Sequence, residues 1–106
     1  YRGEPTKGRT RVGYIPLENI VLEFIEPIDG PSVFQDCLKQ KGNGIHHLAF
    51  IVNGMEHVIG SLEDVGLPLL QNGIFSAMGA APGGRYAFLQ GLDKLGFDVE
   101  LLEFDA

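Results

Sequence analysis

The sequence is poor in the residues that mark several classes of protein. Its 106 residues include no tryptophan and a single cysteine, Cys37, which cannot form a disulfide within the chain. A reducing, cytoplasmic location is therefore expected. Positive charge is also scarce, because eight Lys and Arg face fourteen Asp and Glu, for a net charge of −6. This balance argues against nucleic acid as a partner. No apolar run reaches the roughly 20 residues that span a bilayer, so no membrane partner is expected either.

Glycine is abundant, with fifteen residues, and hydrophobic residues make up 44% of the chain. This composition predicts one globular domain with many tight turns between short strands. From residue 45 onward the patterns predict a complete βαβββ module, in this order: strand 45–52, a helix capped by Asn53 with Met55, Val58, Ile59, Leu62 and Val65 on one face, one or two short strands in 67–77, strand 85–90, hairpin loop 91–96 and strand 97–104.

The preceding segment resembles the end of a second copy of this module. Strand patterns at 9–17 and 20–26 predict a hairpin, and a helix capped by Ser32 or Asp29 is expected after it. Gly8-Arg9 and Gly84-Arg85 each precede a hairpin, and placing Glu23 on Glu100 also places Glu26 on Glu103. We therefore expect an α+β fold in one domain, with residues 1–27 as the tail of a first module, 28–44 as a linker helix and 45–106 as the second module.

Strand alternation brings three ionisable groups to the same kind of face. His47, Glu23 and Glu100 each lie opposite the residues expected to pack on helices. Those helix-packing sets are Ile20, Leu22 and Phe24; Leu48, Phe50 and Val52; and Phe97, Val99 and Leu101. A buried carboxylate needs a partner, and one divalent metal bound by an imidazole and two carboxylates would satisfy all three groups. Taken singly, each acid also fits an exposed or ion-paired role, and the histidine fits a hydrogen-bonded core role.

The stretch GNGIHHLAF at 42–50 resembles the middle of vicinal oxygen chelate proteins, the glyoxalase, bleomycin-resistance and extradiol-dioxygenase superfamily. Methylmalonyl-CoA epimerase and lactoylglutathione-lyase-like members are the most similar in look. LEFIEP at 22–27 is similar to the strand that ends the first module of that family. GRYAFL at 84–89 and GFDVELL at 96–102 are similar to the hairpin that ends the second.

The resemblance implies paired βαβββ modules that form a cupped mixed sheet with helices outside. It implies a divalent metal ion (Zn, Ni, Co, Mn or Mg) bound by Glu23, His47 and Glu100, with Glu100 as the catalytic base. The implied activity is that of an isomerase or lyase acting on a small carbonyl or CoA-thioester substrate. In that reaction a proton is abstracted and the metal stabilises an enediolate.

The sequence departs from the family pattern in its first module. The opening strand, which normally brings a histidine ligand, is absent together with the helix after it. Either the sequence is incomplete at its N-terminus, or another subunit fills the gap, or the metal site is lost. An unpaired sheet edge would favour a homodimer. The alternative functions are a non-catalytic small-molecule binder of the bleomycin-resistance type and a structural domain without a ligand. In a binder, Phe75, Tyr86, Phe88 and Phe104 would line the cavity, although packing in the core is the role more expected of them.

The remaining candidates carry weaker signals. Arg85 is expected either to bind an anionic substrate group or to form a salt bridge with a strand acid, and Phe88 is expected to contact substrate. Roles in the structure or on the surface are expected for His46, and an exposed position for His57. Cys37 fits the apolar face of a helix. The Gly-rich stretch 78–84 is expected to form a flap or a long turn.

Overall fold

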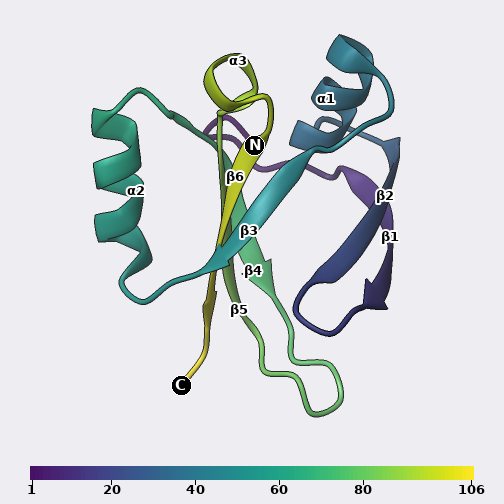
Figure 1. Cartoon of the computed structure of the whole chain (residues 1–106), viewed down its shortest axis with the longest axis vertical. Helices are drawn as coiled ribbons and strands as arrows, with labels where there is room; N and C mark the ends of the chain where they lie inside the picture. Colours follow the sequence, from purple (N-terminus) through teal and green to yellow (C-terminus); the bar gives the residue numbers. More distant parts are fainter. The chain divides into compact units, whose positions relative to one another are not determined.

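The computed structural model describes all 106 residues and divides them into two compact units (Figure 1). We name them the hairpin unit, Glu4–Gly44, and the βαβββ unit, which comprises Tyr1–Gly3 and Ile45–Ala106. The first residues belong to the βαβββ unit because the backbone N–H of Arg2 donates a hydrogen bond to the carbonyl of Leu70 (2.6 Å). No helix in the chain combines the length and the hydropathy needed to cross a bilayer.

The βαβββ unit is built on a four-stranded mixed sheet. Its elements are β3 (His47–Ile51), α2 (Met55–Asp64), β4 (Leu69–Phe75), β5 (Gly84–Leu89), α3 (Leu92–Leu95) and β6 (Asp98–Phe104). The strand order is β3-β6-β5-β4, with β3 parallel to β6 and the other neighbours antiparallel. This arrangement confirms the expected α+β class and the βαβββ order of elements.

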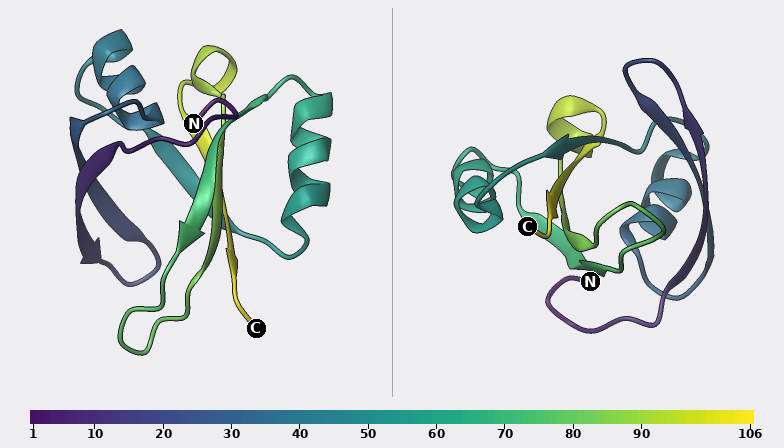
Figure 2. Two further views of the ribbon diagram at one scale, coloured as in Figure 1. Left: turned by 180° about the vertical axis from the view of Figure 1, so that it is seen from behind. Right: turned by 90° about the horizontal axis from the view of Figure 1, so that it is seen from below.

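One face of this sheet packs against α2 and holds the core (Figures 1 and 2). The buried cluster comprises Met55, Leu67, Ala87, Leu89, Val99 and Leu101, and Val58, Ile59, Leu62 and Phe97 pack against it. Alternation along β5 and β6 explains this set, because every second side chain points toward the helix. The expected packing of Val99 and Leu101 is therefore confirmed. For Leu48 and Phe50 of β3 the expectation was wrong, because their side chains are 42% and 50% exposed. Val65 was expected on the same helix face, but α2 ends at Asp64 and the side chain of Val65 is 66% exposed.

The start of α2 differs from the expectation. The N-cap residue is Gly54, in a left-handed conformation that provides no side-chain cap, so the assignment of Asn53 as the cap was wrong. Glu103 of β6 replaces a local cap, since its Oε2 accepts a hydrogen bond from the backbone N–H of Gly54 (2.5 Å). Carboxylates at this end of a helix are also favoured by the helix dipole.

The segment 91–96 also differs from the expected hairpin loop. It forms the short helix α3, which ends at Gly96 with φ of 85°. This left-handed value is one that glycine adopts at little cost. The helix lengthens the connection between β5 and β6 relative to a tight turn.

The hairpin unit consists of β1 (Arg9–Pro16), β2 (Val21–Asp29) and α1 (Val33–Lys41), with β1 and β2 paired antiparallel. The side chain of Ser32 caps α1 by accepting a hydrogen bond from the backbone N–H of Gln35 (3.1 Å). Cys37 is buried on α1, as expected for a small apolar residue.

Three apolar residues in and just before β2 that were expected to pack on a helix are exposed instead. Ile20, Leu22 and Phe24 have exposed fractions of 52%, 41% and 59%. The expectation was wrong because α1, the only helix of this unit, follows β2 and leaves these side chains uncovered.

The two hairpins of the chain share one register. Arg11 lies opposite Glu26 in the first hairpin, and Arg85 lies opposite Glu103 in the second. The placement of Glu26 on Glu103 thus agrees with the backbone pairing. The matching of Gly8-Arg9 with Gly84-Arg85 was wrong, because the connection through α3 is longer than the turn between β1 and β2, so that Arg11 corresponds to Arg85.

Candidate metal centre

His47 and Glu100 meet on the sheet face that α2 does not cover. His47 begins β3, and Glu100 lies in the neighbouring strand β6. Since Val99 and Leu101 point toward α2, the side chain of Glu100 between them must point the other way. The His47 Nε2 and Glu100 Oε2 atoms are 3.0 Å apart, and the two side chains are only 9% and 12% exposed.

This pair has the chemistry of a partial metal site. A largely buried carboxylate is costly unless a cation or a proton neutralises it. Imidazole nitrogen and carboxylate oxygen are the donors with which proteins bind Zn²⁺ and related divalent ions. The residues present therefore fit a divalent metal, and the same geometry also suits an imidazolium–carboxylate pair.

His46 and Asp98 extend the pair into a longer chain of contacts. The Nδ1 atoms of His46 and His47 are 2.8 Å apart. His46 Nε2 lies 3.4 Å from Asp98 Oδ2, and these two side chains are 10% and 2% exposed. The backbone N–H of Asp98 also donates to the carbonyl of His46 (2.8 Å). Of the two positions expected for His46, its side chain thus lies in the interior and not on the surface.

Asp98 was missed in the sequence, although a signal for it was present. It stands two residues before Glu100 in a strand, so alternation places both acids on the same face. Burial alone would raise the pKa of Asp98, but the neighbouring His46 imidazole and a hydrogen bond from the backbone N–H of Gly91 (2.9 Å) outweigh it and hold that pKa below its usual value. Asp98 is therefore ionised at neutral pH.

Aromatic side chains share this sheet face with the histidines. The ring of Phe88 lies 5.6 Å from that of His46 and 5.1 Å from that of His47, with centroids as the reference points. Phe88 itself is 3% exposed. Tyr86 packs beside it (5.7 Å) and accepts a hydrogen bond from Gln71 Nε2 (3.3 Å). Phe75 and Phe104 form a further edge-to-face pair at 5.7 Å. The four aromatic residues expected to line a binding face thus share the face that carries His47.

Arg85 lies on the other face of the sheet, between α2 and β6. Its guanidinium forms ion pairs with Glu56 of α2 and Glu103 of β6. Of the two roles expected for Arg85, the salt bridge to a strand acid is the one present. Two carboxylates thus already bind the guanidinium.

Glu23 lies in β2 of the hairpin unit and is partly buried. It is paired with Tyr14 across the hairpin, as Glu100 is paired with Phe88 in the other unit. The two glutamates thus occupy equivalent places in two hairpins of equal register, each opposite an aromatic residue.

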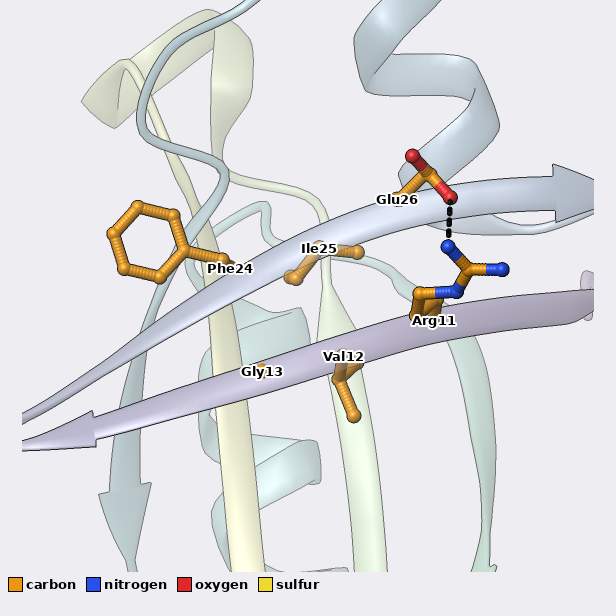
Figure 3. Close-up of a pocket in the computed structure, with 6 residues that line it drawn as sticks. All are labelled: Arg11, Val12, Gly13, Phe24, Ile25 and Glu26. Atoms are coloured by element: carbon orange, nitrogen blue, oxygen red, sulfur yellow. Dashed lines mark ion pairs between the residues drawn. The ribbon is translucent and has the colours of Figure 1, made fainter.

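An open pocket lies on the hairpin unit (Figure 3). It is lined by Arg11, Val12, Gly13, Phe24, Ile25 and Glu26. Arg11 and Glu26 face each other at one end of it, with an N–O distance of 3.5 Å, and both are exposed. None of the three expected ligands lines this pocket.

Comparison with known proteins agrees with this architecture. The model of the Glyoxalase/Bleomycin resistance protein/Dioxygenase superfamily matches residues 4–88. The chain belongs to this superfamily. The match extends over the hairpin unit and most of the βαβββ unit, and it confirms the resemblance carried by the sequence motifs.

Relatives of this superfamily member include a bacterial protein and solved structures. The uncharacterized protein YqjC of Bacillus subtilis (strain 168) is 32% identical over 95 residues, which cover 90% of this chain and 66% of YqjC. The hypothetical protein BH1468 from Bacillus halodurans C-125 superposes with a TM-score of 0.65 at 24% identity, covering 92% of this chain and 68% of that one. Methylmalonyl-CoA epimerase from Mycobacterium tuberculosis gives 0.62 at 23% identity, covering 92% and 64%. The chain thus spans just under two thirds of YqjC, and the two structures show the shared fold.

Proposed function

We propose that His47 and Glu100 bind one divalent metal ion, and that the chain is a metal-dependent isomerase or lyase of the glyoxalase and epimerase type. The observation that carries this proposal is the pair itself. In a member of this superfamily, an imidazole nitrogen and a carboxylate oxygen lie 3.0 Å apart, largely buried, on a sheet face that α2 leaves uncovered. A small carbonyl or CoA-thioester compound is the proposed substrate.

Each residue of the site has a proposed role. When bound, the metal would polarise the carbonyl or thioester oxygen of the substrate and so acidify the neighbouring carbon. Glu100 would remove the proton from that carbon, since a carboxylate with little exposure to water is a suitable base. Phe88 and Tyr86 would cover the site and limit the access of water.

Glu23 is proposed as a further ligand of the metal. The support is its equivalence to Glu100, because both are acids at the same register position of their hairpins. Glu23 is also partly buried, and a carboxylate partly removed from water is stabilised by a cation. The homodimer expected from the unpaired strand edge also remains a proposal.

The aromatic face favours one alternative function. Phe75, Tyr86, Phe88 and Phe104 would suit a non-catalytic binder of apolar small molecules, which requires no metal. The two functions differ in whether bound metal is needed and in whether the α-proton of the ligand exchanges.

Hydrogen exchange at the substrate α-carbon tests the proposal directly. We expect purified protein with Zn²⁺ to exchange the α-proton of methylmalonyl-CoA with deuterium oxide, measured by mass spectrometry, and to lose this exchange on treatment with EDTA. Glu100→Gln should abolish the exchange, because an amide is no base at neutral pH. Glu26→Gln is the matched control, since that side chain is exposed on the hairpin unit. Wild-type protein that fails to bind Zn²⁺ in calorimetry would refute the metal site, and binding of ligand without metal or exchange would support the binder.

A further inference from the structure

Four side chains of the βαβββ unit form a continuous series of polar contacts. They run from Asp98 to His46 at 3.4 Å, from His46 to His47 at 2.8 Å and from His47 to Glu100 at 3.0 Å. All four side chains are at most 12% exposed, so water competes weakly for these contacts. Asp98 is itself held in place by the backbone N–H of Gly91 (2.9 Å).

The order of donors and acceptors in this series follows from ligation of the metal through Nε2 of His47. A ligating nitrogen offers its lone pair, so the proton of the neutral His47 ring then lies on Nδ1. The contact of 2.8 Å between the two Nδ1 atoms makes Nδ1 of His46 the acceptor. In a neutral His46 ring the proton then lies on Nε2, the nitrogen that faces Asp98 Oδ2 at 3.4 Å.

We propose that Asp98 and His46 are positioning residues for His47, holding its ring so that Nε2 presents a lone pair to the metal. This inference rests on the proposed function, and it adds two residues that contact neither metal nor substrate. Ligating histidines commonly donate their second ring N–H to a carboxylate or carbonyl, which fixes the tautomer and the ring orientation. Here another histidine would take that place, and a buried aspartate behind it would set the direction of the hydrogen bonds.

A purely structural role makes a different prediction. Asp98 accepts a hydrogen bond from the backbone N–H of Gly91, and its own backbone N–H donates to the carbonyl of His46. If its role is purely structural, loss of its side chain would loosen the start of α3 and the neighbouring part of the sheet and do nothing more. Substitution of a purely structural residue would lower the melting temperature of the metal-free protein without a specific loss of metal affinity. The two roles are therefore separable by measuring both quantities on the same variants.

The experiment compares Zn²⁺ affinity and stability across four variants. Asp98→Asn can turn an amide N–H toward His46 Nε2 and so reverse the donors and acceptors of the series. His46→Phe removes the contacts of His46 with Asp98 and His47 and leaves every carboxylate in place. Each should weaken Zn²⁺ binding about 10- to 100-fold in calorimetry. His46→Asn restores an acceptor for the Nδ1–H of His47, so most of the affinity should return. Asp93→Asn, at an exposed site of α3, makes the same charge change as Asp98→Asn and should leave the affinity unchanged.

Nuclear magnetic resonance of the ring nitrogens supplies a readout independent of affinity. In Zn²⁺-loaded wild-type protein, long-range ¹H–¹⁵N correlation should show a proton on Nδ1 of His47 and one on Nε2 of His46. The inference is overturned if the proton of His47 lies on Nε2. It is equally overturned if wild type binds Zn²⁺ and both Asp98→Asn and His46→Phe bind it as tightly, whatever their melting temperatures. Failure of wild type itself to bind Zn²⁺ would instead refute the proposed function.

Discussion

Three acids of strand β6 illustrate how position alone gives like residues different partners. Asp98 contacts His46, Glu100 contacts His47, and Glu103 forms an ion pair with Arg85. The first two lie on the face away from α2 and the third on the face toward it, as strand alternation requires. Each carboxylate thus contacts a nitrogen group, and only the first two share the face that carries His47.

Glu103 is expected to make stability depend on pH. The hydrogen bond from Arg85, reinforced by the N–H of Gly54, lowers the pKa of Glu103 in the folded protein. A lowered folded-state pKa stabilises the protein at pH above the ordinary glutamate pKa of about 4.3, and this contribution is lost as pH falls from there through the folded-state pKa. Glu103→Gln should therefore flatten the decline of unfolding free energy over that acidic range, measured by urea denaturation.

The control for this prediction is Glu18→Gln, the same substitution at an exposed site of the turn between β1 and β2. Its pH profile should follow that of wild type. Equal slopes for wild type and Glu103→Gln below pH about 4.3 would contradict the assignment. Glu56 also shares the Arg85 guanidinium, and its pKa is lowered too, so part of the acid dependence should persist in Glu103→Gln.

The sequence predicted, for His47 and for Glu100, the face of the strand on which each side chain lies. Period-2 alternation requires no knowledge of neighbours, whereas the parallel pairing of β3 with β6 is a long-range contact. The link from Asp98 to His46 depends on that pairing, which joins residues about half the chain apart. Local patterns carry no information about such register, so this link was absent from the sequence reasoning.

At the scale of elements, apolar periodicity identified α2 and the strands correctly but misjudged their ends. Asn53 has the right chemistry for a cap, yet Glu103 caps the helix from across the unit. The helix of residues 92–95 is too short to give a periodic signal. In the hairpin unit, Leu22 and Phe24 have the pattern of a packed face, and periodicity cannot tell what covers it. Existence and type of the longer elements were thus local properties, whereas the short helix, the caps and the coverage of the strands were not.

The packing of α2 on the sheet gives a prediction about stability. Leu89 is fully buried in the cluster beneath α2, so Leu89→Ala should lower the unfolding free energy by about 2–5 kcal/mol. The control Ile74→Ala removes an aliphatic side chain that is 83% exposed in β4, and it should change stability by less than about 0.5 kcal/mol. Urea denaturation followed by circular dichroism measures both. Equal effects of the two substitutions would mean that the cluster is not the core of this unit.

At the scale of the whole molecule, the family match and the compact units divide the chain differently. The superfamily model runs through the boundary at residue 44, matching residues 4–88 across both units. Glu23 belongs to one unit, while His47 and Glu100 belong to the other. Shared ligation of one ion would make the two units depend on each other, because a ligand that binds both favours the state in which both are folded.

Amide hydrogen exchange should reveal this dependence. If Glu23 is a ligand, Zn²⁺ will slow exchange in β2 as well as in β3 and β6, because opening of either unit must release the ion. Glu23→Gln should remove the added protection from β2 and leave a weaker protection in β3 and β6, where His47 and Glu100 remain. The exposed Glu26→Gln, in the same strand, should behave as wild type. Protection confined to β3 and β6 in wild type would exclude Glu23 as a ligand. The metal would then be held by the βαβββ unit alone, and His47 and Glu100 would be its only ligands among the three residues that the sequence selected.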